Sequence, residues 1–355
     1  MRKQVYRTLT AKLQRRLRAS NAAQVRNLAL LSQALVFSRN CHLPNLALEM
    51  PIEGERECLI QRLRRLLKNS QVQWRVHYLP LVKALLNHWP DQEVNLIMDR
   101  TDIGQEKSIL MLALAFKHRA LPLTWRVLPF GGTGEALQMS LLAEVEPYLP
   151  AVAEKRICFY GDSEFRAVAL QRYCQQRQWG WQVGVKSDTL FHQGDGQWQP
   201  LSRIPIQPGE RHHCHHITLT QAHCFGPVHL TVDWKHNHQQ PRYVVCDRPT
   251  KHATWRSGRK RFWIEPFFRD YKSAGFDLEC SRITDDERLM RLLLGMAVTT
   301  LWLLHLGHWV VQSGRRPWLA TDYRNDYSLF RLGRDYAQRS LTQNWKLPIF
   351  FSRRS

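Results

Sequence analysis

The stretch EVNLIMDR, residues 93–100, decides the fold class of this chain. It is an apolar run that ends in Asp99, and two further apolar runs follow it, SILMLALAFK at 108–117 and LPLTWRVL at 121–128. Apolar runs of this length, separated by short polar turns, are typical of β-strands, and the three-residue gap between the last two predicts a hairpin. Three consecutive strands are therefore expected to begin the main sheet.

Helices and strands alternate after these three strands. Residues 134–148 and 166–178 carry apolar side chains at helical spacing, whereas RICFY at 156–160 and GWQVGVK at 180–186 are typical of strands. Parallel neighbouring strands need helical crossovers between them. The order therefore predicts an α/β fold, a mixed sheet with helices on its faces.

The rest of the chain divides around this sheet. Of its 51 Lys and Arg, against 30 Asp and Glu, sixteen lie in residues 1–90 with only four acidic residues, and leucines recur there at helical spacings. Such a basic helical segment favours DNA docking over a merely solvated face. The expected units are a basic helical DNA-binding domain (1–90), the first part of a catalytic domain (91–187), a β-rich insertion (188–255), a second, helical part of the catalytic domain (256–312) and a basic, partly ordered tail without a clear period (313–355).

One segment has the length and composition of a membrane span. Residues 292–311, LLLGMAVTTLWLLHLGHWVV, contain no Asp, Glu, Lys or Arg. Arginines flank both ends, so the positive-inside asymmetry is missing, and a buried core helix is the preferred interpretation. The first residues lack an apolar signal core, and the eight cysteines form no CxxC pair. We therefore expect a cytoplasmic protein without a membrane partner.

Two aspartates follow strands that should be neighbours. Asp99 closes the first predicted strand and Asp162 the fourth, and Glu265 opens a later helix. Three carboxylates that converge from such positions can hold two divalent cations about 4 Å apart, the arrangement that cleaves phosphodiesters. An aspartate after a strand is also a common turn residue or helix N-cap, and that alternative stays open for each aspartate by itself.

The stretch RFWIEPFFRDYK, residues 261–272, resembles the signature of bacterial insertion-sequence transposases of the insertion-sequence-four type. That signature is Tyr, two residues, Arg, three residues, Glu, six residues, Lys. Arg261, Glu265 and Lys272 match it, whereas the tyrosine position is occupied by Gly258. LIMDRTD at 96–102 and YGDSEF at 160–165 look like the catalytic aspartates of the family, so the resemblance covers roughly residues 90–305.

The resemblance implies a DNA transposase with a ribonuclease-H-like catalytic domain. Asp99, Asp162 and Glu265 would be the catalytic residues and would bind two Mg²⁺ ions, for which Mn²⁺ should substitute. The N-terminal helices would bind the terminal inverted repeats of the element in double-stranded DNA. Cut-and-paste excision through hairpin ends, strand transfer into target DNA, a homodimer in the synaptic complex and a place on the bacterial nucleoid are implied as well.

The same signature can be interpreted without the family. On a helix, positions 261, 265, 269 and 272 fall on one stripe, so Arg261, Arg269 and Lys272 would flank Glu265 and grip DNA phosphates. A surface ladder of salt bridges above an apolar core is the alternative.

Other residues are weaker candidates. Asp102 or Glu164 would replace a neighbouring ligand if the strand register differs by a residue or two. Arg100 and Lys186 are DNA-contact candidates that are otherwise ordinary solvated cations. Trp234, with basic neighbours, is a candidate to stack on a base pulled out of the duplex, or else part of a small β core.

Ten of the sixteen histidines lie in 188–255, but their spacing matches no common zinc finger, and incidental enrichment is preferred to a zinc site. Two further functional alternatives stay open. One is a non-catalytic DNA-binding protein derived from a transposase, which Gly258 favours. The other is a ribonuclease-H-like nuclease that cuts without strand transfer.

Overall fold

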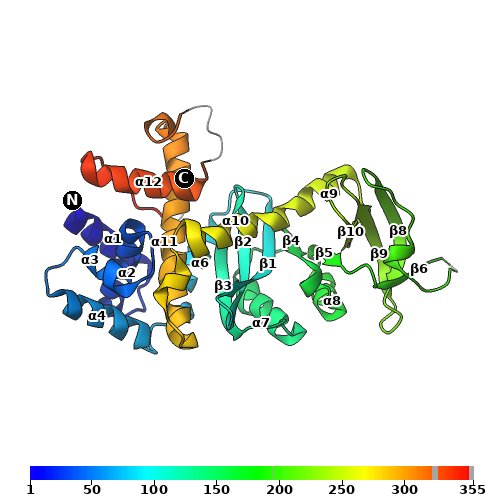
Figure 1. Cartoon of the computed structure of the whole chain (residues 1–355), viewed down its shortest axis with the longest axis horizontal. Helices are drawn as coiled ribbons and strands as arrows, with labels where there is room; N and C mark the ends of the chain where they lie inside the picture. Colours follow the sequence, from blue (N-terminus) through cyan, green and yellow to red (C-terminus); the bar gives the residue numbers. More distant parts are fainter. Residues whose placement is uncertain (195, 322–326, 352–355) are drawn as a thin grey trace.

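The computed structural model describes residues 1–194, 196–321 and 327–351 of the 355-residue chain. Its N-terminal part is helical, as the leucine spacing predicts (Figure 1). Leu9 and Leu13 are fully buried, and Asn21 caps the second helix by accepting a hydrogen bond from the Ala23 amide. The helices are α1 (Arg2–Arg16), α2 (Ala22–Ser38), α3 (Leu43–Leu48), α4 (Arg56–Lys68), α5 (Trp74–His77) and α6 (Leu79–Asn87).

The predicted order of strands and helices in the central part is confirmed. The strands are β1 (Glu93–Ile103), β2 (Lys107–Phe116), β3 (Arg119–Pro129), β4 (Arg156–Gly161) and β5 (Gly180–Val185), and the crossover helices are α7 (Glu135–Val145) and α8 (Val168–Gln176). Short 3-10 turns are η1 (Glu146–Tyr148), η2 (Ser163–Phe165) and η3 (Leu201–Arg203). In Figure 1, α7 and α8 lie below the strands, and the later helices α9 and α10 run above them.

The first and fourth strands are parallel neighbours, as expected, and their last paired residues are Ile97 and Tyr160. Asp99 and Asp162 each lie two residues beyond this pair, so they occupy matching positions. The expectation that Asp99 closes its strand is wrong. β1 continues to Ile103 because its pairing with β2 extends to Lys107.

The β-rich segment is part of the same sheet. It contains β6 (Leu190–Gln193), β7 (Gln199–Pro200), β8 (Arg211–Leu219), β9 (Phe225–Asp233) and β10 (Arg242–Cys246), all paired antiparallel. β10 also pairs with β5, with Tyr243 opposite Val185. One ten-stranded mixed sheet results, in the order β3-β2-β1-β4-β5-β10-β9-β8-β6-β7.

The segment with the signature residues changes helical type four times. It runs through α9 (His252–Gly258), the 3-10 helix η4 (Arg259–Trp263), α10 (Ile264–Arg269), the π-helix η5 (Asp270–Ala274) and the 3-10 helix η6 (Leu278–Ser281). Ile264, Phe267 and Phe268 of α10 are buried, as the sequence predicts for the apolar side of this helix.

The long apolar helix α11 (Asp286–Gln312) lies inside the protein. It is long and apolar enough to cross a membrane, but 94% of its apolar window is buried in the fold. Asp285 caps it by accepting a hydrogen bond from the Arg288 amide at 2.8 Å. The preference for a core helix is confirmed by this burial.

The tail is more ordered than its sequence suggests. After η7 (Arg316–Trp318), α12 (Leu329–Thr342) packs against α11. An added Cβ on Gly333 would lie 2.0 Å from the carbonyl oxygen of Leu303, so the helices approach closely. Its buried residues recur at helical spacing, so the expectation of a tail without a clear period is wrong for residues 329–342; they are Phe330, Leu332, Gly333, Tyr336, Ala337 and Ser340. Residues 322–326 and 352–355 of the predicted tail lie outside the described residues.

Candidate active site at the β1–β4 edge

Asp99 lies within β1 at the edge of a cavity. Its Oδ1 accepts a hydrogen bond from the Arg100 amide at 2.8 Å. Burial raises the pKa of Asp99 to about 7; the charge of Arg261 and the Arg100 hydrogen bond oppose this, and the charges of Asp162 and Glu265 add to it. The three predicted catalytic carboxylates and Arg261 therefore share one electrostatic environment.

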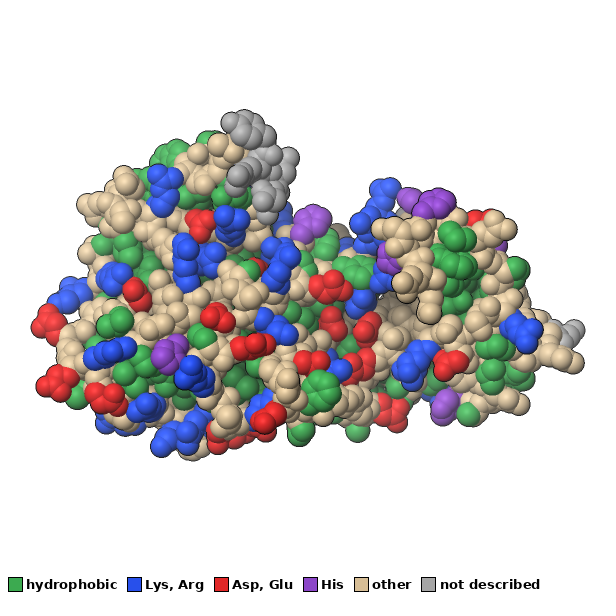
Figure 2. Space-filling view, in the orientation of Figure 1, with side chains coloured by type: hydrophobic (Ala, Val, Ile, Leu, Met, Phe, Trp, Pro, Cys, Tyr) green, Lys and Arg blue, Asp and Glu red, His purple; other side chains and the backbone are tan. Residues whose placement is uncertain are grey.

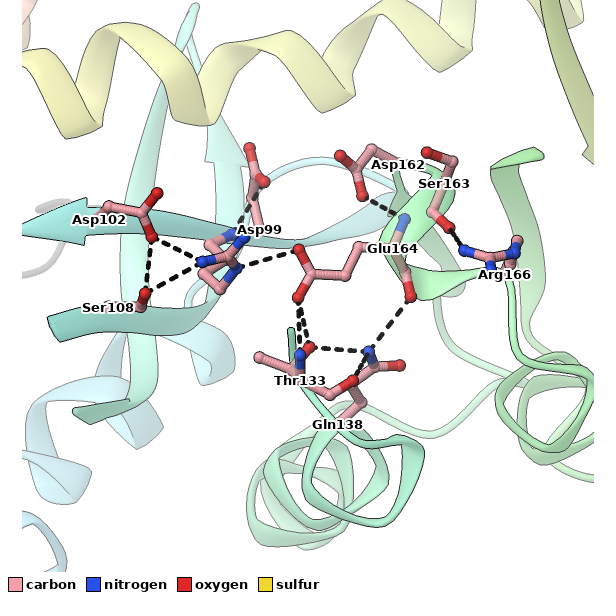
Figure 3. A network of polar contacts seen from close by, with 10 residues as sticks. Asp99, Asp102, Ser108, Thr133, Gln138, Asp162, Ser163, Glu164 and Arg166 are labelled. Carbon is pink, nitrogen blue, oxygen red and sulfur yellow. Dashed lines mark hydrogen bonds and ion pairs between the residues drawn. The ribbon is translucent and has the colours of Figure 1, made fainter. Parts of the chain in front are cut away.

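Asp162 follows β4 directly. Its Oδ1 accepts a hydrogen bond from the Glu164 amide at 2.8 Å, so it caps η2 in the way that the turn interpretation expects. Figure 3 shows that the carboxylates of Asp99 and Asp162 nonetheless lie on the same side of the sheet, below the helical segment drawn above it. A capping role and a place in the site are therefore compatible for this residue.

Glu265 faces the sheet edge from α10. Its side chain is 56% exposed, and its Oε1 lies 3.6 Å from a guanidinium nitrogen of Arg261. Glu265, Arg269 and Lys272 line one cavity of about 510 Å³ together with Asp99. Glu265, Arg269 and Lys272 of the predicted stripe thus stay on one face despite the changes of helical type, and this face lies toward Asp99.

A second cavity, of about 490 Å³, adjoins Asp162. Arg261 lines it rather than the first, with Lys186 from the end of β5 and Arg242 from β10. The guanidiniums of Arg242 and Arg261 lie 4.5 and 4.3 Å from the ring centre of Phe262. Lys186 therefore lines the cavity beside Asp162, and its contact with DNA stays a prediction.

The aromatic residue beside this cavity is Trp255, whereas Trp234 is not among the residues that line it. The indole nitrogen of Trp234 donates to the His238 carbonyl oxygen at 2.9 Å, within the connection after β9. Gly258, at the signature tyrosine position, also lines the cavity, and an added Cβ there would lie 2.4 Å from Oε1 of Gln182. Gln182 therefore occupies the space next to the tyrosine position.

Arg100 holds the two alternative ligands. Its Nε lies 3.1 Å from Glu164, and its Nη1 lies 2.6 Å from Asp102 and 3.0 Å from Ser108 (Figure 3). Glu164 also accepts hydrogen bonds from the amide and hydroxyl of Thr133, at 3.0 and 2.7 Å. Asp102 and Glu164 are therefore both ion-paired with Arg100, and the guanidinium of Arg100 contacts these two carboxylates rather than solvent.

The donor set has the chemistry of a magnesium site. Three carboxylates supply the hard oxygen ligands that Mg²⁺ prefers, and their mutual repulsion at Asp99 is what a divalent cation would relieve. Within the described residues, however, no group of three or more His, Cys, Asp or Glu side chains is drawn close enough to hold a metal ion as it stands. The same finding applies to the histidine-rich strands, where His215 and His229 lie 3.2 Å apart through their Nδ1 atoms.

Sequence reasoning missed Arg242, Gln182 and Phe262. Arg242 reaches the site only because β10 pairs with β5, and no local sequence motif indicates that long-range pairing. Phe262 lies inside the quoted signature beside Arg261, but its contact with Arg242 is visible only in the structure.

Comparisons with known proteins show a distant similarity of shape. No protein-family model and no curated protein sequence match the chain. A cryo-EM structure of piggyBac transposase in a synaptic complex with hairpin DNA is similar over 89% of this chain and 70% of that chain, with a TM-score of 0.47 and 11% identity. An Argonaute of Marinitoga piezophila with guide RNA and target DNA is similar over 64% of this chain and 34% of its own, with a TM-score of 0.22 and 7% identity.

Proposed function

We propose that this protein is a DNA transposase with a ribonuclease-H-like catalytic domain. In this proposal Asp99, Asp162 and Glu265 hold two Mg²⁺ ions, and the protein nicks the ends of an insertion sequence and joins them to target DNA. The bacterial insertion-sequence-four type, the terminal inverted repeats, hairpin ends and a homodimeric synaptic complex belong to the same proposal, which the motif residues support.

The single observation that carries the proposal is the matched position of the two aspartates. β1 and β4 are parallel neighbours, and Asp99 and Asp162 both lie two residues past their last pair. Side chains at equivalent positions of parallel strands emerge on the same face of the sheet. Glu265 of α10 lines one cavity with Asp99.

The residues of the chain have distinct roles in this chemistry. When bound, Mg²⁺ would supply the positive charge that favours an ionised attacking water or hydroxyl and a negatively charged leaving oxygen. Asp99, Asp162 and Glu265 would be its ligands. Arg269 and Lys272 line the Glu265 cavity and are placed to bind phosphates. Arg261, Lys186 and Arg242 line the Asp162 cavity and would bind the strand there, beside Trp255 as a stacking surface for a base.

The test is cleavage by the full-length protein of DNA that carries the terminal repeats of its own element. With Mg²⁺, wild-type protein should cut and join these ends, and Mn²⁺ should replace Mg²⁺. Asp162→Ala should lower cleavage at least a thousandfold while the affinity for the ends stays within threefold. Cleavage retained by Asp162→Ala would contradict the assignment.

A non-catalytic DNA-binding protein is the second candidate. It is favoured by Gly258 at the tyrosine position and by the open arrangement of the three carboxylates. The same assay separates the two, because this candidate binds ends without metal-dependent cleavage. A nuclease on the same fold would cut without producing joined strands.

A further inference from the structure

A concentration of arginines lies beside the catalytic cavity, where α12, α10 and the end of α2 meet. Figure 2 shows Lys and Arg side chains gathered over α12 and the adjoining part of α10. They line a cavity of about 540 Å³ that we call the arginine cradle. Its charged lining residues are Arg39, Arg119, Arg269, Arg331, Arg334 and Arg339, with Asp270 and Asp335.

The two acidic residues described in the cradle cannot neutralise its six arginines. Asp335 faces three guanidiniums, with Arg39 at 4.0 Å, Arg331 at 3.5 Å and Arg334 at 3.9 Å. At such distances, no guanidinium obtains the close bidentate pair that one carboxylate offers one arginine. The described part of the cradle is therefore strongly positive.

Arg334 is the most constrained of these arginines. Its side chain is only 11% exposed; one Nη donates to the Ala274 carbonyl oxygen at 2.7 Å, and its Nε has no hydrogen-bond partner among the described residues. Burial is the main cause that lowers the pKa of Arg334; the charges of Asp335 and Asp270 oppose this, and the charges of Arg39 and Arg331 add to it. Gathering like charges around a buried cation costs free energy unless an anion compensates them.

The second carboxylate of the cradle, that of Asp270, already pairs with Arg119. Asp270 accepts a hydrogen bond from Nε of Arg119 at 3.0 Å, and it is at least as buried as Arg334. It therefore balances Arg119 and does not neutralise the exposed Arg331 and Arg339 of α12; Arg331 also donates to the Tyr327 hydroxyl at 3.1 Å. Arg339 also donates to the Trp318 carbonyl oxygen.

The cradle is continuous with the candidate active site. Arg269 lines the cradle and also lines the cavity of Asp99 and Glu265. A chain of phosphates that leaves the active-site cavity along α10 would meet the cradle next. Guanidinium forks suit such phosphates because they bind two oxygens in a plane.

We propose that the arginine cradle binds the phosphodiester backbone of duplex DNA that extends from the catalytic cavity. This inference rests on the proposed function and adds a second contact region to it, built by the tail helix α12 and independent of base sequence. The N-terminal basic helices would read the repeat, and the cradle would hold the backbone.

The salt dependence of binding tests the cradle. The full-length protein is titrated against a fluorescent 40-base-pair duplex of arbitrary sequence over a range of salt concentrations. Each lost phosphate contact should reduce the slope of log Kd against log salt by about 0.9. The double variant Arg331→Ala/Arg339→Ala should lower this slope by about 1 to 2 and weaken binding about tenfold or more at low salt. Arg331→Lys/Arg339→Lys should keep most of the slope because it keeps the charge.

The matched control is Arg172→Ala/Arg203→Ala, which removes two exposed arginines away from the cradle. Thermal unfolding checks that each variant folds, and Arg331→Ala alone, with an expected slope change of about 1, replaces the double variant if Arg339 proves necessary for folding. Equal slopes for the cradle and control variants would overturn the proposal. If wild-type protein fails to cleave its ends but the cradle variant still loses slope, the proposed function fails and the cradle stands.

Discussion

Arg100 and Glu164 connect the two proposed catalytic aspartates through the backbone. The amide of Arg100 binds Asp99, the amide of Glu164 binds Asp162, and the two side chains form an ion pair at 3.1 Å. Because this ion pair fixes the two side chains relative to each other, it also restrains the backbone amides that orient Asp99 and Asp162. Arg100 and Glu164 are therefore positioning residues in this arrangement.

Glu164→Gln should lower the cleavage rate by about ten- to a hundredfold and raise the Mg²⁺ concentration needed for half-maximal rate, because supporting contacts of this kind tune metal sites by such factors. The measurement is single-turnover cleavage across a Mg²⁺ titration. Asp102→Asn is the control, since Asp102 binds Arg100 but its amide contacts neither aspartate. A thousandfold loss would instead assign Glu164 as a ligand, and equal effects of both variants would contradict a positioning role.

Asp270 gives a pH-dependent contribution to stability. Burial raises its pKa from 3.8 to about 6, against the opposing charges of Arg119, Arg334 and Arg269. The native protein therefore holds this proton more tightly than the unfolded chain, so the contribution is complete below about pH 4 and is lost as pH rises toward 6.

Asp270→Asn should remove this dependence, because the amide stays neutral at every pH. The free energy of unfolding of wild type minus that of the variant should fall by about 2 kcal/mol between pH 4 and pH 6.5, and stay flat above that. Urea unfolding at several pH values measures it. A difference that is constant across this range would refute the raised pKa.

At the scale of elements, the α11–α12 contact depends on two glycines. An added Cβ on Gly307 would lie 1.8 Å from the Leu329 carbonyl oxygen, and one on Gly333 would lie 2.0 Å from that of Leu303. Backbone atoms cannot rotate away as side-chain ends do, so these positions admit no larger residue without separating the helices.

Gly333→Ala should destabilise the protein by about 2 kcal/mol or more, although alanine favours helices, because overpacking outweighs propensity here. Thermal unfolding of the full chain measures it. Gly132→Ala is the control, since nothing lies within 4 Å of its added Cβ and its φ is not positive. Wild-type stability in Gly333→Ala would mean that α12 is not packed against α11 in this way.

The elements show where sequence reasoning succeeds and where it stops. The apolar runs predict β1, β2, β3, β4 and β5 and the neighbouring β1 and β4, because each pattern is local and each crossover constrains the topology. The tail helix was missed although Phe330, Leu332 and Tyr336 recur at helical spacing, because this period covers only residues 329–342 of the basic tail. The end of β1 was misplaced because hydrogen bonds to β2, rather than apolarity, extend it.

At the scale of the molecule, the sequence predicts which carboxylates influence one another but not how closely they approach within the described residues or what surrounds them. Asp99, Asp162 and Glu265 share one electrostatic environment, and Lys186 is at the site. Trp255 rather than Trp234 lines the cavity, and Arg242 arrives from a strand far along the chain. These neighbours depend on long-range strand pairing, which single-sequence periodicity does not encode.

The N-terminal helices share a core with α11. Arg291 of α11 donates to the Leu67 carbonyl oxygen at 3.1 Å, and Thr299 donates to that of Ser32 at 3.4 Å. Leu31 and Leu35 lie against Gly295. A unit of 90 residues that leaves this apolar face uncovered has little stability of its own.

Residues 1–90 expressed alone should therefore contain helix by circular dichroism but unfold without a cooperative transition, in contrast to the full chain. Thermal melts of the two proteins compare them directly. A sharp transition in the fragment at the temperature of the full chain would show that α11 is dispensable for this part.

The pairing of β5 with β10 has a mechanical consequence. Hydrogen bonds cross from the strands of the candidate active site into those of the histidine-rich segment without a gap. A continuous hydrogen-bonded sheet of this kind resists bending at the β5–β10 junction. The distance between its two ends therefore stays fixed when a partner binds. If the proposed DNA partner binds across this sheet, the duplex would bend or unstack to fit the protein, rather than the protein closing around the duplex.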